Sequence, residues 1–244
     1  MNLENAIDTL RSQEETIIGV LIERAQLTTN QGAYRREQSE EGLHSSLLEQ
    51  WLFQHERIEA LFGRFLSPEE KSFHAPLPDP MLEVTVRPPS PELVGPENVN
   101  LTGEIRDRYL QLVPEICPRG DGQRYDLSIE RDVIALKAIS RRIHFGALYV
   151  AELKYREDPD TFDRAAREAA ESGDRSGLEQ MVTRADVESE LVERVRIKAG
   201  QLQERTDGRI RRLVDPDEIA EFYEKTIVRL TKEGEILYLF NRPQ

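Results

Sequence analysis

Apolar residues recur at helical spacing through most of the chain, so the sequence predicts an all-α protein. The first run, from Leu3 to Ala25, predicts a long amphipathic helix over residues 3 to about 28. The last helix is expected to begin at Asp215, which supplies a capping acceptor, with Pro216 in its first turn and Glu218 at the capping-box position. Between them, the spacing predicts helices over 47–65, 105–113, 127–156, 160–172, 174–182 and 184–205.

Two stretches break this pattern and are expected to connect helices. Residues 28–42 are polar and favour a loop. Residues 68–96 hold eight of the 13 prolines and predict an extended connection over 68–100 with little regular structure. No pair of strands joined by a turn is expected. The chain is therefore expected to form one helical domain over residues 1–244.

Composition narrows the classes of function. Hydrophobic residues make up 38% and charged residues 32% of the chain, which suits a soluble protein with amphipathic helices and excludes a wholly disordered one. The formal net charge is -13, and such a surface repels nucleic acid and anionic membranes. Any site for an anion must therefore be a local positive pocket.

Cysteine and histidine usage argues against metal chemistry. Cys117 is the only cysteine, so neither an intramolecular disulfide nor a cysteine-based metal site is possible. The four histidines lack the spacing of metal ligands: His44, His55, His74 and His144. The first residues are polar and acidic, and no apolar run approaches the length of a membrane span, so we expect a cytoplasmic protein without a membrane partner.

Residues 140–155, SRRIHFGALYVAELKY, place cations within an apolar helix. Arg142 and Lys154 lie among Ile, Ala, Leu, Phe and Val residues, so we expect their charged ends to point into an interior cavity that would bind an anion. The alternative is that both side chains reach solvent or pair with the nearby acids Glu152 and Glu157.

Two further stretches carry candidate residues. Thr231 and Glu235 are four residues apart and share a helix face beside apolar side chains. A carboxyl group in that setting would have a raised pKa and could donate a hydrogen bond, although a surface Glu beside Lys232 is the alternative. Arg184 and Glu188 are also four residues apart, and an exposed ion pair explains them on spacing alone.

Together these stretches resemble the eukaryotic-type, all-helical chorismate mutases. The likeness runs through the whole chain in the same order, and SRRIHFG followed by VAE, one residue, Lys and an aromatic residue is its most specific part. The matching segments are LENAIDTL with QEETIIGVLIERAQ, GRFLSPEE, RDVIALKAISRRIHFG with VAELKY, TRADVESELVER and PDEIAEFYEKTIVRLTKEGE. The resemblance implies an elongated multi-helix bundle that forms a cytosolic homodimer.

The resemblance also implies a reaction and a set of site residues. Chorismate, a dicarboxylate, rearranges to prephenate in one pericyclic step, so no cofactor, metal or nucleophile is needed. By matching position, Arg142 would bind a carboxylate, while Lys154 and a protonated Glu235 would donate to the ether oxygen. Glu188 would accept a hydrogen bond from the ring hydroxyl, and Thr231 would line the pocket.

Three substrate-facing positions depart from the family pattern. The arginine that the family carries on its first helix is matched by Ile7, and Arg11, one turn further along, is the nearest replacement. An asparagine of the family pocket is matched by Arg184, which could also supply the missing cation. Finally, Arg142 and Lys154 are twelve residues apart where the family has eleven, which would turn Lys154 roughly 100° out of line unless the helix absorbs the extra residue, as a π-bulge around Gly146–Tyr149 would.

A fourth departure concerns regulation. Regulated members of the family bind aromatic amino acids through a Gly-Ser-centred loop before the central helix, and this chain reads RYDLSIERD there, with Asp126 and Leu127 in place of Gly-Ser. We therefore expect weak feedback or none. Two alternatives to a chorismate mutase remain open: a homologue acting on a related chorismate-derived anion, and a non-catalytic homologue or scaffold that binds a partner.

Overall fold

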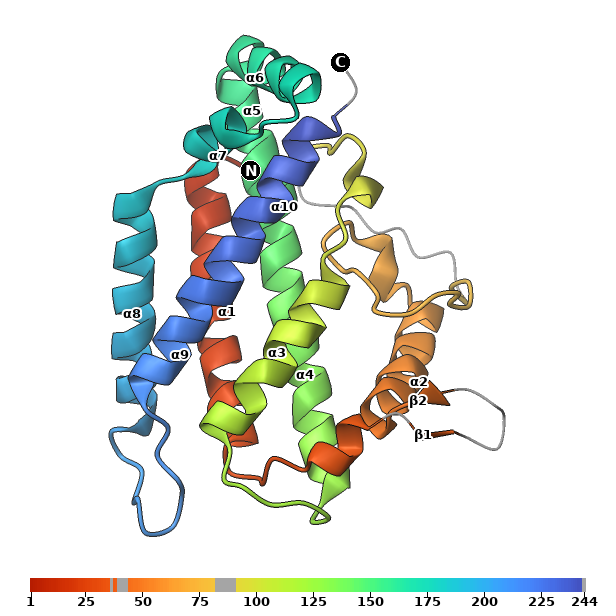
Figure 1. Cartoon of the computed structure of the whole chain (residues 1–244), viewed down its shortest axis with the longest axis vertical. Coiled ribbons are helices and arrows are strands. Elements are labelled where there is room, and N and C mark those ends of the chain that lie inside the picture. The colour runs from red at the N-terminus through yellow and green to blue at the C-terminus, as the bar shows by residue number, and fades with distance from the viewer. Residues whose placement is uncertain (36, 39–43, 82–90, 243–244) are drawn as a thin grey trace.

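The computed structural model describes residues 1–35, 37–38, 44–81 and 91–242, and the described residues are mostly helical (Figure 1). The all-α class predicted from the periodicity is confirmed. The α-helices are α1 (Leu3–Arg24), α2 (Leu47–Leu61), α3 (Thr102–Ile116), α4 (Tyr125–Phe145), α5 (Ala151–Glu157), α6 (Pro159–Ser172), α7 (Ser176–Val182), α8 (Ala185–Gln203), α9 (Pro216–Phe222) and α10 (Arg229–Phe240).

Short elements of other kinds join these helices. The π-helix η4 (Gly146–Val150) connects α4 to α5, and the π-helix η5 (Tyr223–Val228) connects α9 to α10. Three 3₁₀ turns lie in the connections: η1 (Gln31–Tyr34), η2 (Arg64–Leu66) and η3 (Pro96–Asn98). The predicted helix over 127–156 is therefore one long rod, α4–η4–α5, with a single π turn inside it.

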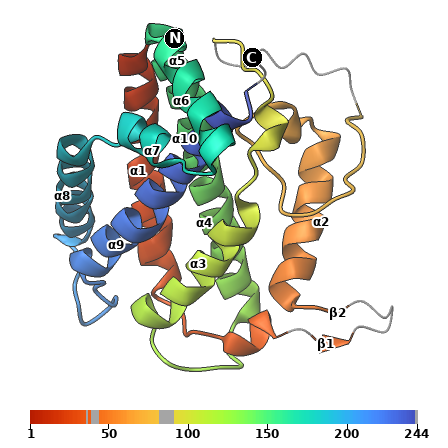
Figure 2. The same ribbon diagram turned by 45° about the horizontal axis from the view of Figure 1, so that its top comes forward.

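The helices form an elongated bundle around two long rods. Helices α1 and α4 pack against each other along the length of the molecule, and the rod α9–η5–α10 crosses them (Figure 1). Helix α8 covers one side and α2 lies on the other, as Figure 2 also shows, and the helices α6 and α7 close the upper end in Figure 1. This arrangement brings one face each of α1, α4–α5, α8 and α10 around a common space.

The first helix ends earlier than its apolar pattern predicts. The side chain of Arg24, the last residue of α1, turns back to donate to the carbonyl oxygens of Thr28 and Thr29 at 3.0 and 3.2 Å. It also pairs with Asp132 on α4 at 2.6 Å, with both side chains fully buried. The following turn thus has its carbonyls satisfied by a side chain, so the backbone need not continue as a helix.

The expectation of no strand pair is wrong for the described residues. Strands β1 (Glu37–Gln38) and β2 (His44–Ser45) form a two-residue antiparallel ladder within and just after the predicted 28–42 loop. The ladder is too short to show the alternation of apolar and polar residues from which a strand is predicted.

The long proline-rich connection is only partly described. Its residues at 82–90, including Pro88 and Pro89, lie outside the described residues. The remainder of 68–100 holds only the turn η3 as regular structure, as predicted. Within the described chain, no helix is long and apolar enough to cross a membrane.

Candidate active site

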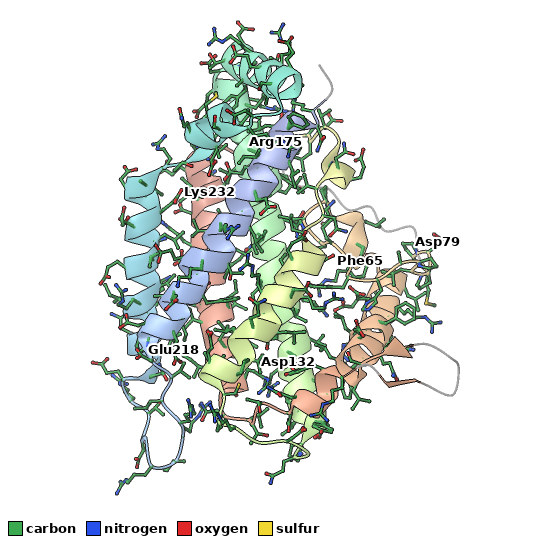
Figure 3. The ribbon with its side chains drawn as sticks, viewed as in Figure 1. Phe65, Asp79, Asp132, Arg175, Glu218 and Lys232 are labelled. Carbon is green, nitrogen blue, oxygen red and sulfur yellow. The ribbon has the colours of Figure 1, made fainter. Side chains whose placement is uncertain are left out.

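A cavity of about 190 Å³ lies where α1, α4–α5, α8 and α10 meet. Figure 3 places Lys232, one of its lining residues, on α10 toward the end of the molecule capped by α6 and α7, whereas Asp132 lies near the opposite end. All seven residues that the sequence predicts for the site line this cavity: Arg11, Arg142, Lys154, Arg184, Glu188, Thr231 and Glu235.

Arg142 lies in the last turn of α4 and is only 2% exposed. Its guanidinium carbon lies 5.6 Å from the centre of the Tyr223 ring, and its Nε has no hydrogen-bond partner in the described chain. Burial lowers the pKa of this guanidinium. A buried cation without an ion pair among the described residues is costly, so this position favours an anion on the cavity side. The alternative that Arg142 reaches solvent is wrong.

Of the two outcomes that the sequence left open, the structure has the π-bulge, as η4 at Gly146–Val150. A π turn holds one residue more than an α turn, so twelve residues cover the same three turns that eleven would. The insertion is absorbed inside the helix, and Lys154 stays on the side of the rod that faces the cavity. Arg142 and Lys154 therefore both face one space.

Lys154 and Glu235 form the most closely bonded pair in the cavity. The Lys154 Nζ lies 2.6 Å from Glu235 Oε2 and also donates to the carbonyl oxygen of Val182 at 3.1 Å. Burial raises the pKa of Glu235, which is 5% exposed, although the charge and hydrogen bond of Lys154 oppose that shift; nearby Glu188 adds to it. A carboxyl group with a raised pKa can keep its proton and donate it.

Glu188 and Thr231 complete the polar lining near this pair. Lys232 Nζ donates to Glu188 Oε2 at 3.0 Å, and the backbone N–H of Arg184 donates to Glu188 Oε1 at 3.4 Å. No side-chain ion pair links Arg184 to Glu188 in the described chain, so the simple surface-pair interpretation is wrong. The Thr231 hydroxyl donates to the carbonyl oxygen of Ile227 at 2.7 Å.

The two candidates for the missing first-helix cation differ in their surroundings. Ile7 lines the cavity, so this part of its wall is apolar. Arg11 pairs with Asp8 at 3.3 Å, and its side chain is 49% exposed. Arg184 lies at the N-cap position of α8 without a side-chain capping bond and is exposed, and its guanidinium has no hydrogen bond or ion pair among the described residues.

A third charged pair in the cavity wall was missed from the sequence. Glu14 on α1 is fully buried and accepts from Arg194 on α8 at 2.8 and 3.1 Å, and from Lys198 at 3.2 Å. Burial alone would raise the pKa of Glu14, but its bonds to these two cations lower it. The available signal was its spacing, since Glu14 lies seven residues after Ile7 and thus on the same helix face.

The cavity is positive on an acidic protein. Six cationic side chains and four carboxylates line it, a formal charge of +2 when every carboxyl group is ionised. A protonated Glu235 makes it more positive still. Because the chain as a whole carries -13, positive charge is concentrated in this cavity, which favours an anionic ligand there. No group of three metal-ligating side chains occurs among the described residues.

The fold and this cavity define an all-helical protein with a positively charged cavity between its helices. Curated relatives match it over its whole length: chorismate mutase 2 of Petunia hybrida is 35% identical over 99% of this chain and 93% of its own. The chorismate mutase of Schizosaccharomyces pombe is 31% identical over 99% and 96%.

Solved structures agree with the curated relatives. The Aro7p chorismate mutase of Candida albicans, in complex with L-Trp, superimposes with a TM-score of 0.88 at 32% identity and covers 99% of this chain and 91% of its own. No protein-family model matches. The chain belongs to the eukaryotic-type chorismate mutase family, which makes it an isomerase of the chorismate mutase kind.

Proposed function

We propose that this cavity binds chorismate and catalyses its rearrangement to prephenate. The observation that carries the proposal is the placement of Arg142 and Lys154 on one side of a continuous rod, facing one cavity, despite the extra residue between them. Arg142, which is buried and whose Nε has no hydrogen-bond partner among the described residues, would bind one carboxylate of the substrate. The positive cavity supports a dianionic ligand.

The remaining groups would act on the bond that breaks. As the C–O bond of the ether opens, negative charge develops on its oxygen, and donors fixed beforehand stabilise that charge. Lys154 Nζ and a protonated Glu235 lie 2.6 Å apart and can donate to one oxygen. Glu188 would accept from the ring hydroxyl, and the apolar wall around Ile7 would favour the compact conformer by confining it.

Chorismate consumption with identification of the product tests this proposal. We expect stoichiometric prephenate from purified protein without added metal or cofactor. A different product would support the alternative that the chain acts on a related chorismate-derived anion. Tight chorismate binding without turnover would support the non-catalytic alternative, and either outcome would remove the proposal.

The pH dependence should report on Glu235. Only its protonated form donates, so kcat/KM should be highest below the pKa of Glu235 and fall as the pH rises through that value. Because burial raises this pKa, the decline should lie above the usual range of a glutamate. We expect Glu235→Gln to abolish the decline, since an amide donates at any pH. A rate that is flat from about pH 5 to about pH 8.5 in the unsubstituted protein would contradict this role.

We propose that Arg184, rather than Arg11, supplies the second carboxylate contact. Both side chains line the cavity and are exposed, but the Arg184 guanidinium has no hydrogen bond or ion pair among the described residues, whereas Arg11 is paired with Asp8. We expect Arg184→Ala to raise KM by about tenfold with a smaller change in kcat, and Arg11→Ala to change either constant by no more than about twofold. The reverse order of effects would assign the contact to Arg11.

Feedback by aromatic amino acids is expected to be weak or absent. Asp126 and Leu127 stand at the Gly-Ser positions, and Asp126 is bonded to Arg124 at 2.8 and 3.0 Å, which places a carboxylate at the start of α4. Added tyrosine or tryptophan should shift the apparent affinity for chorismate by less than about threefold. A larger shift with either would contradict this proposal, and the relative that binds L-Trp is the positive control.

We propose a cytosolic homodimer, as the resemblance implies. Large apolar side chains on the outer face of α2, Ile58 and Phe62, are 58% and 70% exposed, which supports a surface that a second copy could cover. Sedimentation equilibrium should give twice the 28.1 kDa chain mass. A monomer at micromolar concentration would contradict the dimer and leave the cavity unaffected.

A further inference from the structure

Four residues on one face of α10 contact either η4, which carries the extra residue, or α5, which follows it. They lie at spacings of three, four and seven, so they form one stripe along the helix. We call them the α10 stripe: Thr231, Gly234, Glu235 and Tyr238.

The first half of the stripe meets η4 at two points where only small side chains fit. A Cβ atom placed on Gly234 would lie 2.5 Å from the Cβ of Ala147. A Cβ atom placed on Gly146 would lie 2.6 Å from the Cγ2 of Thr231. Real Cβ atoms do not approach that closely, so the two glycines allow the π turn and α10 to lie at a distance that alanine would prevent.

The second half of the stripe meets α5 through polar contacts. Glu235 bonds to Lys154 at 2.6 Å, and the Tyr238 hydroxyl donates to Glu152 Oε2 at 2.7 Å. Glu152 is fully buried and also pairs with Arg156 and with Arg242 beyond the end of α10. The rod is thus held by α10 at Glu152 and at Lys154 itself.

We propose that the α10 stripe clamps the π turn against α10 and so fixes where along the rod the extra residue is absorbed. A helix can absorb an inserted residue as a π turn at any point along its length. The position of that π turn decides which side chains change the direction in which they face. Contacts at Gly146, Ala147 and Glu152 specify the turn before Lys154. Gly146, Gly234 and Tyr238 are then positioning residues, which act through Lys154 and Glu235 without touching the substrate. This inference rests on the proposed function of the same cavity.

The test is a pair of compensating substitutions. Gly234→Ala adds a methyl group where the Ala147 methyl already lies, and it should push α10 from η4. We expect kcat to fall by about tenfold or more, since a misplacement of about 1 Å can cost about a hundredfold. Because Lys154 lowers the pKa of Glu235, loss of their contact should also move the high-pH decline of kcat/KM to higher pH.

The second substitution should reverse both effects. Adding Ala147→Gly to Gly234→Ala removes the opposing methyl group, and kcat should return to within about threefold of the unsubstituted value, with the pH decline restored. Gly19→Ala, at a helical glycine with no other atom nearby, is the matched control and should leave kcat within about twofold. A Gly234→Ala protein with normal kcat and a normal pH profile, or a double variant as impaired as the single one, would overturn the clamp.

A second variant covers the possibility that Gly234→Ala does not fold. Tyr238→Phe removes one hydroxyl and no bulk, and we expect a lower kcat with the pH decline moved upward; wild-type values would overturn the proposal. If the unsubstituted protein does not convert chorismate, the proposed function is wrong, and the clamp needs a test that does not depend on activity. The clamp is then decided by the crystal structure of the Gly234→Ala protein, where a Lys154–Glu235 distance still near 2.6 Å would reject it.

Discussion

Replacing Arg142 by alanine should reduce kcat/KM for chorismate by about a thousandfold, equivalent to about 4 kcal/mol of transition-state stabilisation. The guanidinium is 2% exposed, so its contact with a carboxylate would be shielded from water and correspondingly strong. Steady-state kinetics with chorismate measure the effect, and most of it should appear in KM if the contact forms equally in the ground and transition states.

The neighbouring arginine provides the control for this experiment. Arg141 has the same charge on the same helix, but its side chain is 52% exposed and pairs with Glu70 at 3.3 Å away from the cavity. Arg141→Ala should leave kcat/KM within about twofold, because an exposed ion pair contributes little. Equal losses in the two variants would show that charge alone, rather than the buried position of Arg142, accounts for binding.

Replacing Lys154 by methionine should lower kcat by about a thousandfold with a smaller change in KM. Methionine preserves much of the side-chain volume but removes the donor to the developing oxyanion, which acts mainly in the transition state. It also leaves Glu235 buried without its cationic partner, so the pKa of that carboxyl should rise and keep it protonated. Glu235 would then be the remaining donor, which is why some activity should persist.

Lys225→Met is the matched control for the lysine. Lys225 lies in η5, pairs with Glu221 four residues earlier, and is 68% exposed. The same substitution there should leave kcat unchanged within about twofold. If Lys154→Met behaved like this control, the carried-over role of Lys154 would be wrong, even with the π-helix in place.

Helical periodicity identified the helices and the order of the family segments identified the site, but contacts between distant residues could not be predicted in this way. The π turn at Gly146–Val150 could be raised as one of two outcomes because the spacing of Arg142 and Lys154 could be compared with the spacing in the family. The second π turn, η5, has no such pair of reference residues, and its sequence continues an ordinary apolar pattern. Nothing local distinguishes it from an α-helix.

The charged group in the cavity wall that the sequence did not predict was missed for a different reason. Glu14 lies in the polar run QEET, which favours a solvent-facing turn, yet it is fully buried because Arg194 and Lys198 approach it from α8. That pairing joins residues 180 positions apart and depends on how α8 packs on α1. The ends of the helices could not be predicted for a similar reason. Helix α1 ends at Arg24 because the arginine side chain, held by Asp132, bonds the carbonyl oxygen of Thr28 in place of the next backbone N–H groups. The spacing of apolar residues carries no information on such a tertiary contact.

The most direct test of the account is a crystal structure of the protein with a bicyclic dicarboxylate that mimics the compact transition state of the rearrangement. The account predicts the ligand in the cavity between α1, α4–α5, α8 and α10, with one carboxylate on Arg142. Its ether oxygen should lie within hydrogen-bond distance of both Lys154 Nζ and Glu235, and η4 should remain a π turn. A ligand bound elsewhere, or bound in this cavity with Lys154 turned away from the ether oxygen, would contradict the claim that the π turn directs both cations to one substrate.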